Sequence, residues 1–120
     1  MVVRAVRAAI QIDANERDLI LEGASELVRE VLRRNGLTND DLISIVFTAT
    51  PDLDAEFPAY AARLMGMTDV PLLCSTEIAV PGAMPRVLRL LAHVETDRAR
   101  ADIAHPYLRG AAALRRDLPQ

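Results

Sequence analysis

The amino-acid sequence predicts a domain of the α/β (α+β) class, built on a mixed β-sheet with helices on one face. The chain has 120 residues, a length that suits one domain, and we take residues 1–120 as a single unit. Segments with strand-like and helix-like patterns follow one another in the order β-α-β-α-β-β. The sequence contains no internal repeat, low-complexity tract or linker that would divide this unit.

The first predicted element is a strand over Val2 to Ile10. Its even-numbered residues would face one side of the sheet, and its odd-numbered residues, including Arg7, would face the other side. Two arginines in a first strand, Arg4 and Arg7, are unusual if both faces of that strand are buried.

The second predicted element is a helix from about Asn15 to Arg34. Asp13 is positioned to cap it, with Glu16 three residues later as the partner in a capping box. Gly36 is placed to end the helix. The apolar stripe at helical spacing consists of Ile20, Ala24, Leu27, Val28 and Val31.

Three shorter elements follow the helix. Ile43 to Ala49 is a β-rich segment that predicts a mostly buried strand. Pro58 opens a short helix that ends near Gly66, because proline is tolerated in the first helical turn. Val70 to Ser75 predicts a third short strand.

The segment from Val87 to Glu95 fits two patterns. Its leucines and valines form a helical stripe, but strict alternation also works and places Arg89 on one face. We favour a strand, because valines bracket the segment and Thr96-Asp97 ends it. The tail from Tyr107 to Arg116 is apolar with arginines at its end, and its pattern predicts no particular structure.

Composition indicates an oligomer. Hydrophobic residues make up 51% of the chain, mean hydropathy is +0.13, and aromatic residues are only 3%. A chain this short buries only about two-thirds of its surface when it folds alone. We therefore expect sister subunits to cover part of the aliphatic surface.

Several partners and compartments are disfavoured. The net charge of −3 argues against nucleic acid or an anionic membrane as partner. Arg4 and Arg7 interrupt the first apolar segment, so no signal peptide is expected, and no stretch approaches a membrane span. Cys74 is the only cysteine, which fits a reducing cytoplasm.

The residues that could carry chemistry each have two interpretations. Arg89 lies among leucines and valines, so its charge must either pair internally or face a cavity. Cys74 is either a nucleophile or a small buried strand residue, and the second is favoured. Glu77 is either a solvated loop residue or an acceptor for a ligand hydroxyl. Arg63 and Arg115 are surface and tail charges by default.

All 14 basic residues are arginine, which reflects either genome composition or the bidentate binding of planar anions. The sequence has no glycine-rich phosphate loop, dinucleotide fingerprint, convincing metal site or Ser-His-Asp order. An enzyme built from these residues would act by positioning and fixed charge.

Several short motifs, taken in order, resemble the monofunctional bacterial chorismate mutases that form trimers with an α/β-barrel appearance. The resemblance runs from about Val3 to Leu118. It is carried by Val3-Arg4-Ala5-Val6-Arg7, Ala49-Thr50-Pro51-Asp52-Leu53, Phe57-Pro58-Ala59, Val70-Pro71, Cys74, Glu77, Arg89, His105 through Leu108 and Leu114-Arg115.

The resemblance implies a homotrimeric isomerase that rearranges chorismate to prephenate in clefts between subunits, without a metal or cofactor. Arg89 would meet the charge that develops on the ether oxygen. Arg7 would hold a carboxylate from the adjacent subunit, and the Tyr107 hydroxyl would donate to a carboxylate. The other implied substrate contacts are Glu77, Cys74 and Leu73 at the ring hydroxyl, Phe57 and Ala59 in the apolar wall, and Arg63 and Arg115 at the mouth.

Two departures from the family stand out. Tyr60 occupies a position that is often basic in the family, so no contact is assigned to it. Residues 78–85 differ from the acidic, glycine-richer turn of relatives, which leaves the geometry of this loop open. Two other functions remain as alternatives: a trimeric imine-deaminase-like enzyme, and a non-catalytic trimeric ligand-binding module of the same fold.

Overall fold

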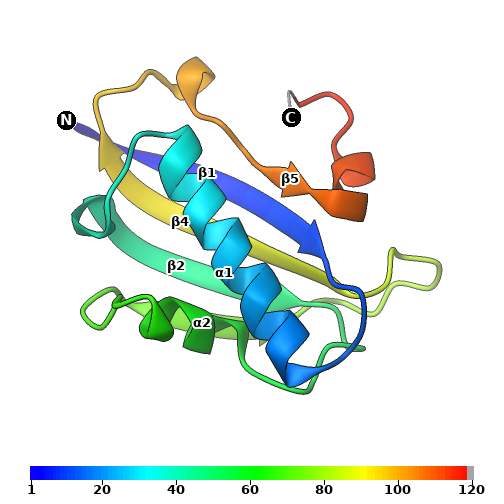
Figure 1. Ribbon diagram of the computed structural model, residues 1–120. Helices are drawn as coiled ribbons and strands as arrows, with labels where there is room; N and C mark the ends of the chain where they lie inside the picture. Colours follow the sequence, from blue (N-terminus) through cyan, green and yellow to red (C-terminus); the bar gives the residue numbers. More distant parts are fainter. Residues whose placement is uncertain (119–120) are drawn as a thin grey trace.

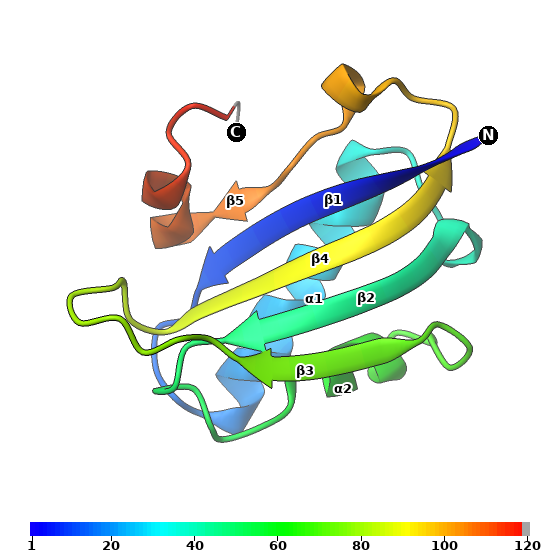
Figure 2. The same ribbon diagram turned by 180° about the vertical axis from the view of Figure 1, so that it is seen from behind.

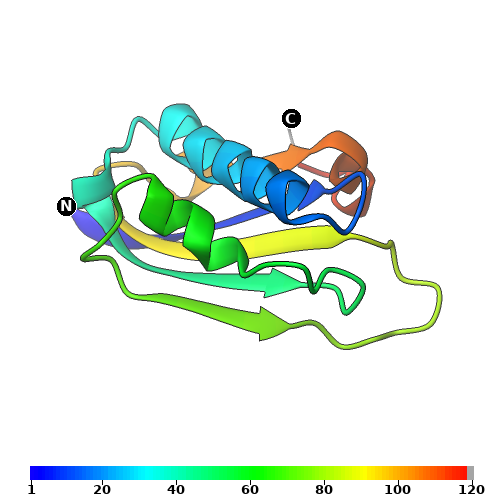
Figure 3. The same ribbon diagram turned by 60° about the horizontal axis from the view of Figure 1, so that its bottom comes forward.

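Two helices pack against one face of a five-stranded mixed sheet in the computed structural model, which describes residues 1–118 (Figures 1 and 3). The predicted α/β architecture is therefore confirmed. In chain order the helices and strands are β1 (Val2–Gln11), α1 (Arg17–Arg34), β2 (Leu42–Ala49), α2 (Pro58–Leu64), β3 (Leu72–Thr76), β4 (Val87–Thr96) and β5 (Tyr107–Leu108). Short 3-10 turns cover Asn39–Asp41, Arg100–Asp102 and Arg109–Leu114.

The sheet has the strand order β3-β2-β4-β1-β5 (Figure 2). The central strand β4 runs antiparallel to both β1 and β2, whereas the edge strands β3 and β5 run parallel to their neighbours. The strand interpretation of residues 87–95 is thus confirmed. Side chains of β4 alternate between a buried set on the helix side and a more exposed set on the opposite, open face.

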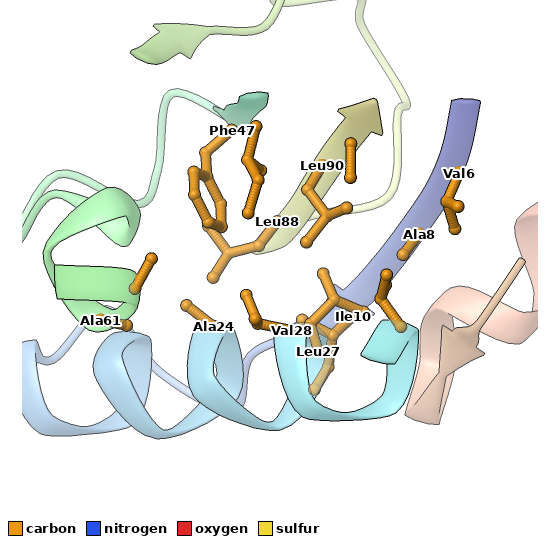
Figure 4. Packing of buried hydrophobic residues seen from close by; sticks show 14 of the residues in the cluster. Val6, Ala8, Ile10, Ala24, Leu27, Val28, Phe47, Ala61, Leu88 and Leu90 are labelled. Atoms are coloured by element: carbon orange, nitrogen blue, oxygen red, sulfur yellow. The ribbon is translucent and has the colours of Figure 1, made fainter. Parts of the chain in front are cut away.

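The core lies between the sheet and α1, with α2 completing it (Figure 4). All five residues of the predicted α1 stripe are buried, and Gly23 joins them. They meet the inward side chains of β1, β2 and β4, such as Ile10, Phe47 and Leu88. Burial of this stripe is what holds the helix on the sheet, because helix propensity alone contributes little.

The start of α1 differs from the prediction. The helix begins at Arg17 with Glu16 as its N-cap, and no side chain caps it, so the expected capping box of Asp13 and Glu16 is wrong. Asn15 instead points to a distant loop, where its amide bonds the backbone and side chain of Asp54. These bonds tie the segment before α1 to the loop that follows β2.

The end of α1 matches the prediction. Gly36 adopts φ +62°, and its N–H donates to the carbonyl of Arg33. The N–H of Leu37 donates to the carbonyl of Leu32 at 2.8 Å. These two bonds form a Schellman motif, which needs a left-handed residue at the glycine position.

The tail takes a defined place that the pattern did not predict. β5 adds a short parallel strand beside β1, and the following 3-10 turn brings Ala111 against Tyr107. A second small cluster forms there from Ala9, Val87, Tyr107 and Ala111. Among residues 1–118, no helix is long and apolar enough to cross a membrane.

Candidate active site

Arg89 and Thr48 lie directly opposite each other on the open face of the sheet, in β4 and β2. Directly opposite residues of an antiparallel pair share one face. The Arg89 side chain is 40% exposed. It is therefore less buried than its position among leucines and valines in the sequence suggested. Both interpretations of Arg89 hold, because its charge is paired and it also faces a cavity.

The partner of Arg89 is Glu77, which follows β3. The Arg89 Nε donates to both carboxylate oxygens of Glu77, at 3.2 and 3.1 Å. The Thr48 hydroxyl donates to Oε2 of the same carboxylate at 2.6 Å. Glu77 is therefore an ordered acceptor and is not a solvated loop residue, with its side chain only 17% exposed.

A cavity of about 340 Å³ adjoins this group on the open face. Arg7 of β1 and Tyr107 of β5 line it together with Thr48 and Arg89. Within residues 1–118, the Arg7 guanidinium has no hydrogen-bond partner, so its donors remain available for a ligand. Two guanidinium groups and a phenol around one cavity suit a ligand with carboxylate groups.

Arg115 belongs to the same region. Its guanidinium binds Asp117 through two hydrogen bonds, at 2.9 and 2.6 Å. The bonded Asp117 carboxylate raises the pKa of Arg115, and a side-chain hydrogen bond with Tyr107 adds to this effect. The same contact with Arg115 lowers the pKa of Asp117 to about 2.

A second cavity, of about 570 Å³, lies between α2 and the edge strand β3. It collects the other five predicted site residues. Its lining consists of Phe57, Ala59, Arg63, Leu73 and Cys74 with Arg17, Glu56, Tyr60 and Leu72. Neither of these two cavities, nor any of three others in residues 1–118, contains residues of both groups.

Cys74 is exposed, so the favoured interpretation of a buried strand residue is wrong. Its side chain points toward α2, where the Ala59 N–H donates to Sγ at 3.4 Å. Partial desolvation raises the pKa of the Cys74 thiol, and the Ala59 hydrogen bond opposes this only in part. The thiol is therefore a weak nucleophile at neutral pH. Within residues 1–118, no group of three or more His, Cys, Asp or Glu side chains could hold a metal ion.

Two residues at these cavities were not predicted from the sequence as site residues. Thr48 was assigned only to a mostly buried strand. The one feature that could have marked it is a polar side chain in an otherwise apolar strand. Arg17 comes from the start of α1, and its guanidinium lies 5.8 Å from the ring centroid of Tyr60 while its Nε pairs with Glu56 at 2.8 Å. Tyr60 replaces a residue that is often basic in the family, and Arg17 brings a positive charge next to it. No local sequence pattern indicated that Arg17 lies there.

Comparison with known proteins gives consistent matches. The family model described as chorismate mutase type I matches residues 3–118. The chain is 43% identical over 117 residues to chorismate mutase AroH of Thermus thermophilus, covering 97% of this chain and 96% of that protein. It is 34% identical over 119 residues to chorismate mutase AroH of Bacillus subtilis (strain 168), covering 98% and 94%. A solved chorismate mutase from Clostridium thermocellum has a TM-score of 0.90 at 46% identity, covering 92% of this chain and 98% of that one.

Proposed function

Because this chain belongs to the type I chorismate mutase family and converts chorismate to prephenate in aromatic amino acid biosynthesis, we propose that it does so in active sites shared between neighbouring subunits of a homotrimer. The observation that carries this proposal is the division of the ten predicted site residues. Arg7, Arg89 and Tyr107 line the open-face cavity, and Glu77 and Arg115 are hydrogen-bonded to residues that line it. The other five line the α2–β3 cavity. A site that needs both groups is completed by a second copy of the chain.

The reaction is an intramolecular Claisen rearrangement, in which an ether C–O bond breaks and a C–C bond forms within one molecule. No atom enters or leaves, so the protein must hold the reactive conformer and stabilise charge on the ether oxygen. Arg89 is suited to the second task, because its Nε is held by Glu77 and its terminal amino groups have no partner among residues 1–118. We assign it the role of principal catalytic residue.

The remaining residues would bind the substrate. We propose that Arg7 and Tyr107 bind carboxylates, while Glu77 accepts a hydrogen bond from the ring hydroxyl. Their location around the open-face cavity supports this assignment. From the neighbouring subunit, Leu73 and Cys74 would approach the ring hydroxyl, Phe57 and Ala59 would form the apolar wall, and Arg63 would stand at the mouth with Arg115.

Apolar side chains on the open face support the trimer. Leu91 at the centre of β4 is 41% exposed, Val3 of β1 is 57% exposed and Leu73 of β3 is 69% exposed. The helices cover the other face, so these side chains meet water unless another subunit covers them. We expect light scattering to give a mass three times that of one chain, and a monomer at micromolar concentration would contradict the proposal.

The direct test of activity is the loss of ultraviolet absorbance when purified protein is mixed with chorismate. A rate above the spontaneous reaction is expected, and the absence of acceleration would refute the mutase activity. We also propose that the reaction needs no metal or cofactor, so dialysis against EDTA should leave the rate unchanged. We also propose that the enzyme works in the reducing cytoplasm, so it should be active when the Cys74 thiol is kept reduced.

The shared site has its own test. Arg89→Ala removes a residue of the first group, and Arg63→Glu reverses a charge in the second. In a trimer refolded from an equal mixture of these inactive variants, about a quarter of the seams join two intact groups. Recovery of about that fraction of wild-type activity is expected. If the mixture stays inactive while each variant assembles, both groups must come from one chain.

A further inference from the structure

Thr48 carries a half-buried hydroxyl near the end of β2 that no proposed substrate contact uses. It stands opposite Arg89 in the sheet, with Ser75 of β3 on its other side. Its Oγ1 donates to Glu77 at 2.6 Å, one of the shortest hydrogen bonds between side chains in the described residues. A short bond from a hydroxyl to a carboxylate is charge-assisted and strong.

The bond selects which oxygen of Glu77 stays available. Oε2 accepts from both Thr48 and the Arg89 Nε, while among residues 1–118 Oε1 accepts only from the Arg89 Nε. A carboxylate oxygen has two acceptor positions, so Oε1 can take one further donor. The same contacts occupy the Nε of Arg89 and leave its two terminal amino groups without a partner in residues 1–118.

We propose that Thr48 is a positioning residue, whose hydroxyl holds the Glu77 carboxylate on the Nε of Arg89 so that Glu77 Oε1 and the Arg89 amino groups are aimed at the substrate. This inference rests on the roles proposed above for Arg89 and Glu77. Without the Thr48 hydroxyl, the carboxylate loses the contact that sets its rotation, and Arg89 loses a fixed partner. Thr48 itself touches no reacting atom.

A purely structural role makes the opposite prediction. Threonine is a good strand former because of its β-branch, and valine keeps that branch and the shape while losing the hydroxyl. Serine keeps the hydroxyl and loses the methyl group. If Thr48 positions Glu77, turnover should be lost in the valine variant, which lacks the hydroxyl. If Thr48 only packs, both stability and turnover should be lost in the serine variant, which lacks the methyl group.

The test is a pair of variants assayed with chorismate. We expect Thr48→Val to lower kcat by about 10- to 100-fold, because a hydrogen bond to a charged group is lost, with a smaller change in KM. Thr48→Ser should retain turnover within about threefold while melting at a lower temperature. Unchanged turnover in Thr48→Val, or an equal loss in both variants, would overturn the assignment.

Thr96→Val is a matched control at the far end of β4, where the Thr96 Oγ accepts the backbone N–H of Arg98. It should cost stability without a change in kcat. The effect of Thr48→Val should also vanish in a Glu77→Ala background, since the hydroxyl then has no carboxylate to hold. A full additional loss in that background would contradict the proposed route through Glu77.

A crystal structure of Thr48→Val gives a readout apart from activity. We expect the Glu77 carboxylate to rotate away from its contact with the Nε of Arg89. An unchanged Glu77–Arg89 pair would refute the inference. If the wild-type protein itself fails to accelerate the rearrangement, the proposed active site is wrong, but the structure of the variant still decides whether Thr48 positions Glu77.

Discussion

The Nε of Arg89 lies 3.2 and 3.1 Å from the two carboxylate oxygens of Glu77, on the open face of the sheet. The pair joins a central strand to the segment after an edge strand. It explains how a cation is kept in a strand flanked by leucines without being fully buried. It also orients the guanidinium, because within the described part of the chain Nε is the one guanidinium nitrogen with a partner.

The first prediction follows from this pair. Arg89→Ala should lower kcat/KM by at least about 10²- to 10³-fold, the loss typical of one donor to a developing charge. Circular dichroism and assembly should be unchanged, since the side chain is 40% exposed. Arg89→Lys should also be impaired, because an ammonium group cannot bind Glu77 and the substrate in the same geometry.

Arg33→Ala is the control for Arg89→Ala. The Arg33 side chain lies exposed on α1, and its one partner in residues 1–118 is Glu30, so its loss should leave turnover intact. Equal activity in Arg89→Ala and the wild type would remove Arg89 from the mechanism.

The second prediction concerns Cys74. Partial desolvation raises the pKa of its thiol, so the thiolate is scarce at pH 7.5 and iodoacetamide should react more slowly than with the unfolded chain. Mass spectrometry gives both rates. Cys74→Ala should lower kcat/KM less than about tenfold, since one weak contact is lost. A complete loss of activity would point instead to covalent catalysis.

The third prediction is a dependence of stability on pH through His105. Its Nδ1 accepts the backbone N–H of Arg7 at 3.1 Å, which requires the neutral ring. Desolvation and the nearby charge of Arg7, with a smaller effect of Arg115, lower the pKa of His105 below its usual 6.5. As pH falls from 7.5 through this lowered pKa, the unfolded chain binds more protons than the folded one.

The free energy of unfolding should therefore fall over that range. In His105→Asn, whose amide oxygen can accept the same N–H, the fall in melting temperature between pH 7.5 and pH 5.5 should be smaller than in the wild type. If the two proteins show parallel melting curves across this range, His105 is not the group responsible.

The fourth prediction tests the end of α1. Gly36→Ala places a side chain at φ +62° and should reduce the free energy of unfolding by about 1 kcal/mol. Gly36→Asn should cost less, because asparagine tolerates the left-handed region. Urea denaturation measures both changes. Turnover at saturating chorismate should stay at the wild-type level, since this turn lies at the end of α1 outside both site cavities.

Local pattern in the sequence was enough to predict the elements and their faces. Spacing of 3.6 residues identified the buried stripe of α1, and spacing of two placed Arg7 and Arg89 opposite the inward side chains of their strands. Such periods survive in any fold that buries one face, so they can be read without knowing the partner. Gly36 was predictable for a similar reason, because the helix end depends on neighbouring residues alone.

Contacts between distant segments were decided only by the tertiary structure. Asn15 bonds Asp54, Cys74 faces the α2 cavity, and Thr48 meets Glu77 because β2 and β3 pair in one particular register. The periodicity of the sequence predicts which face of its element a side chain lies on. It does not predict which distant residue that side chain contacts. The sequence by itself determined the sheet, the main helix and the family. Folding decided that Thr48, Glu77 and Arg89 form one group, because strand register brings together residues far apart in the chain.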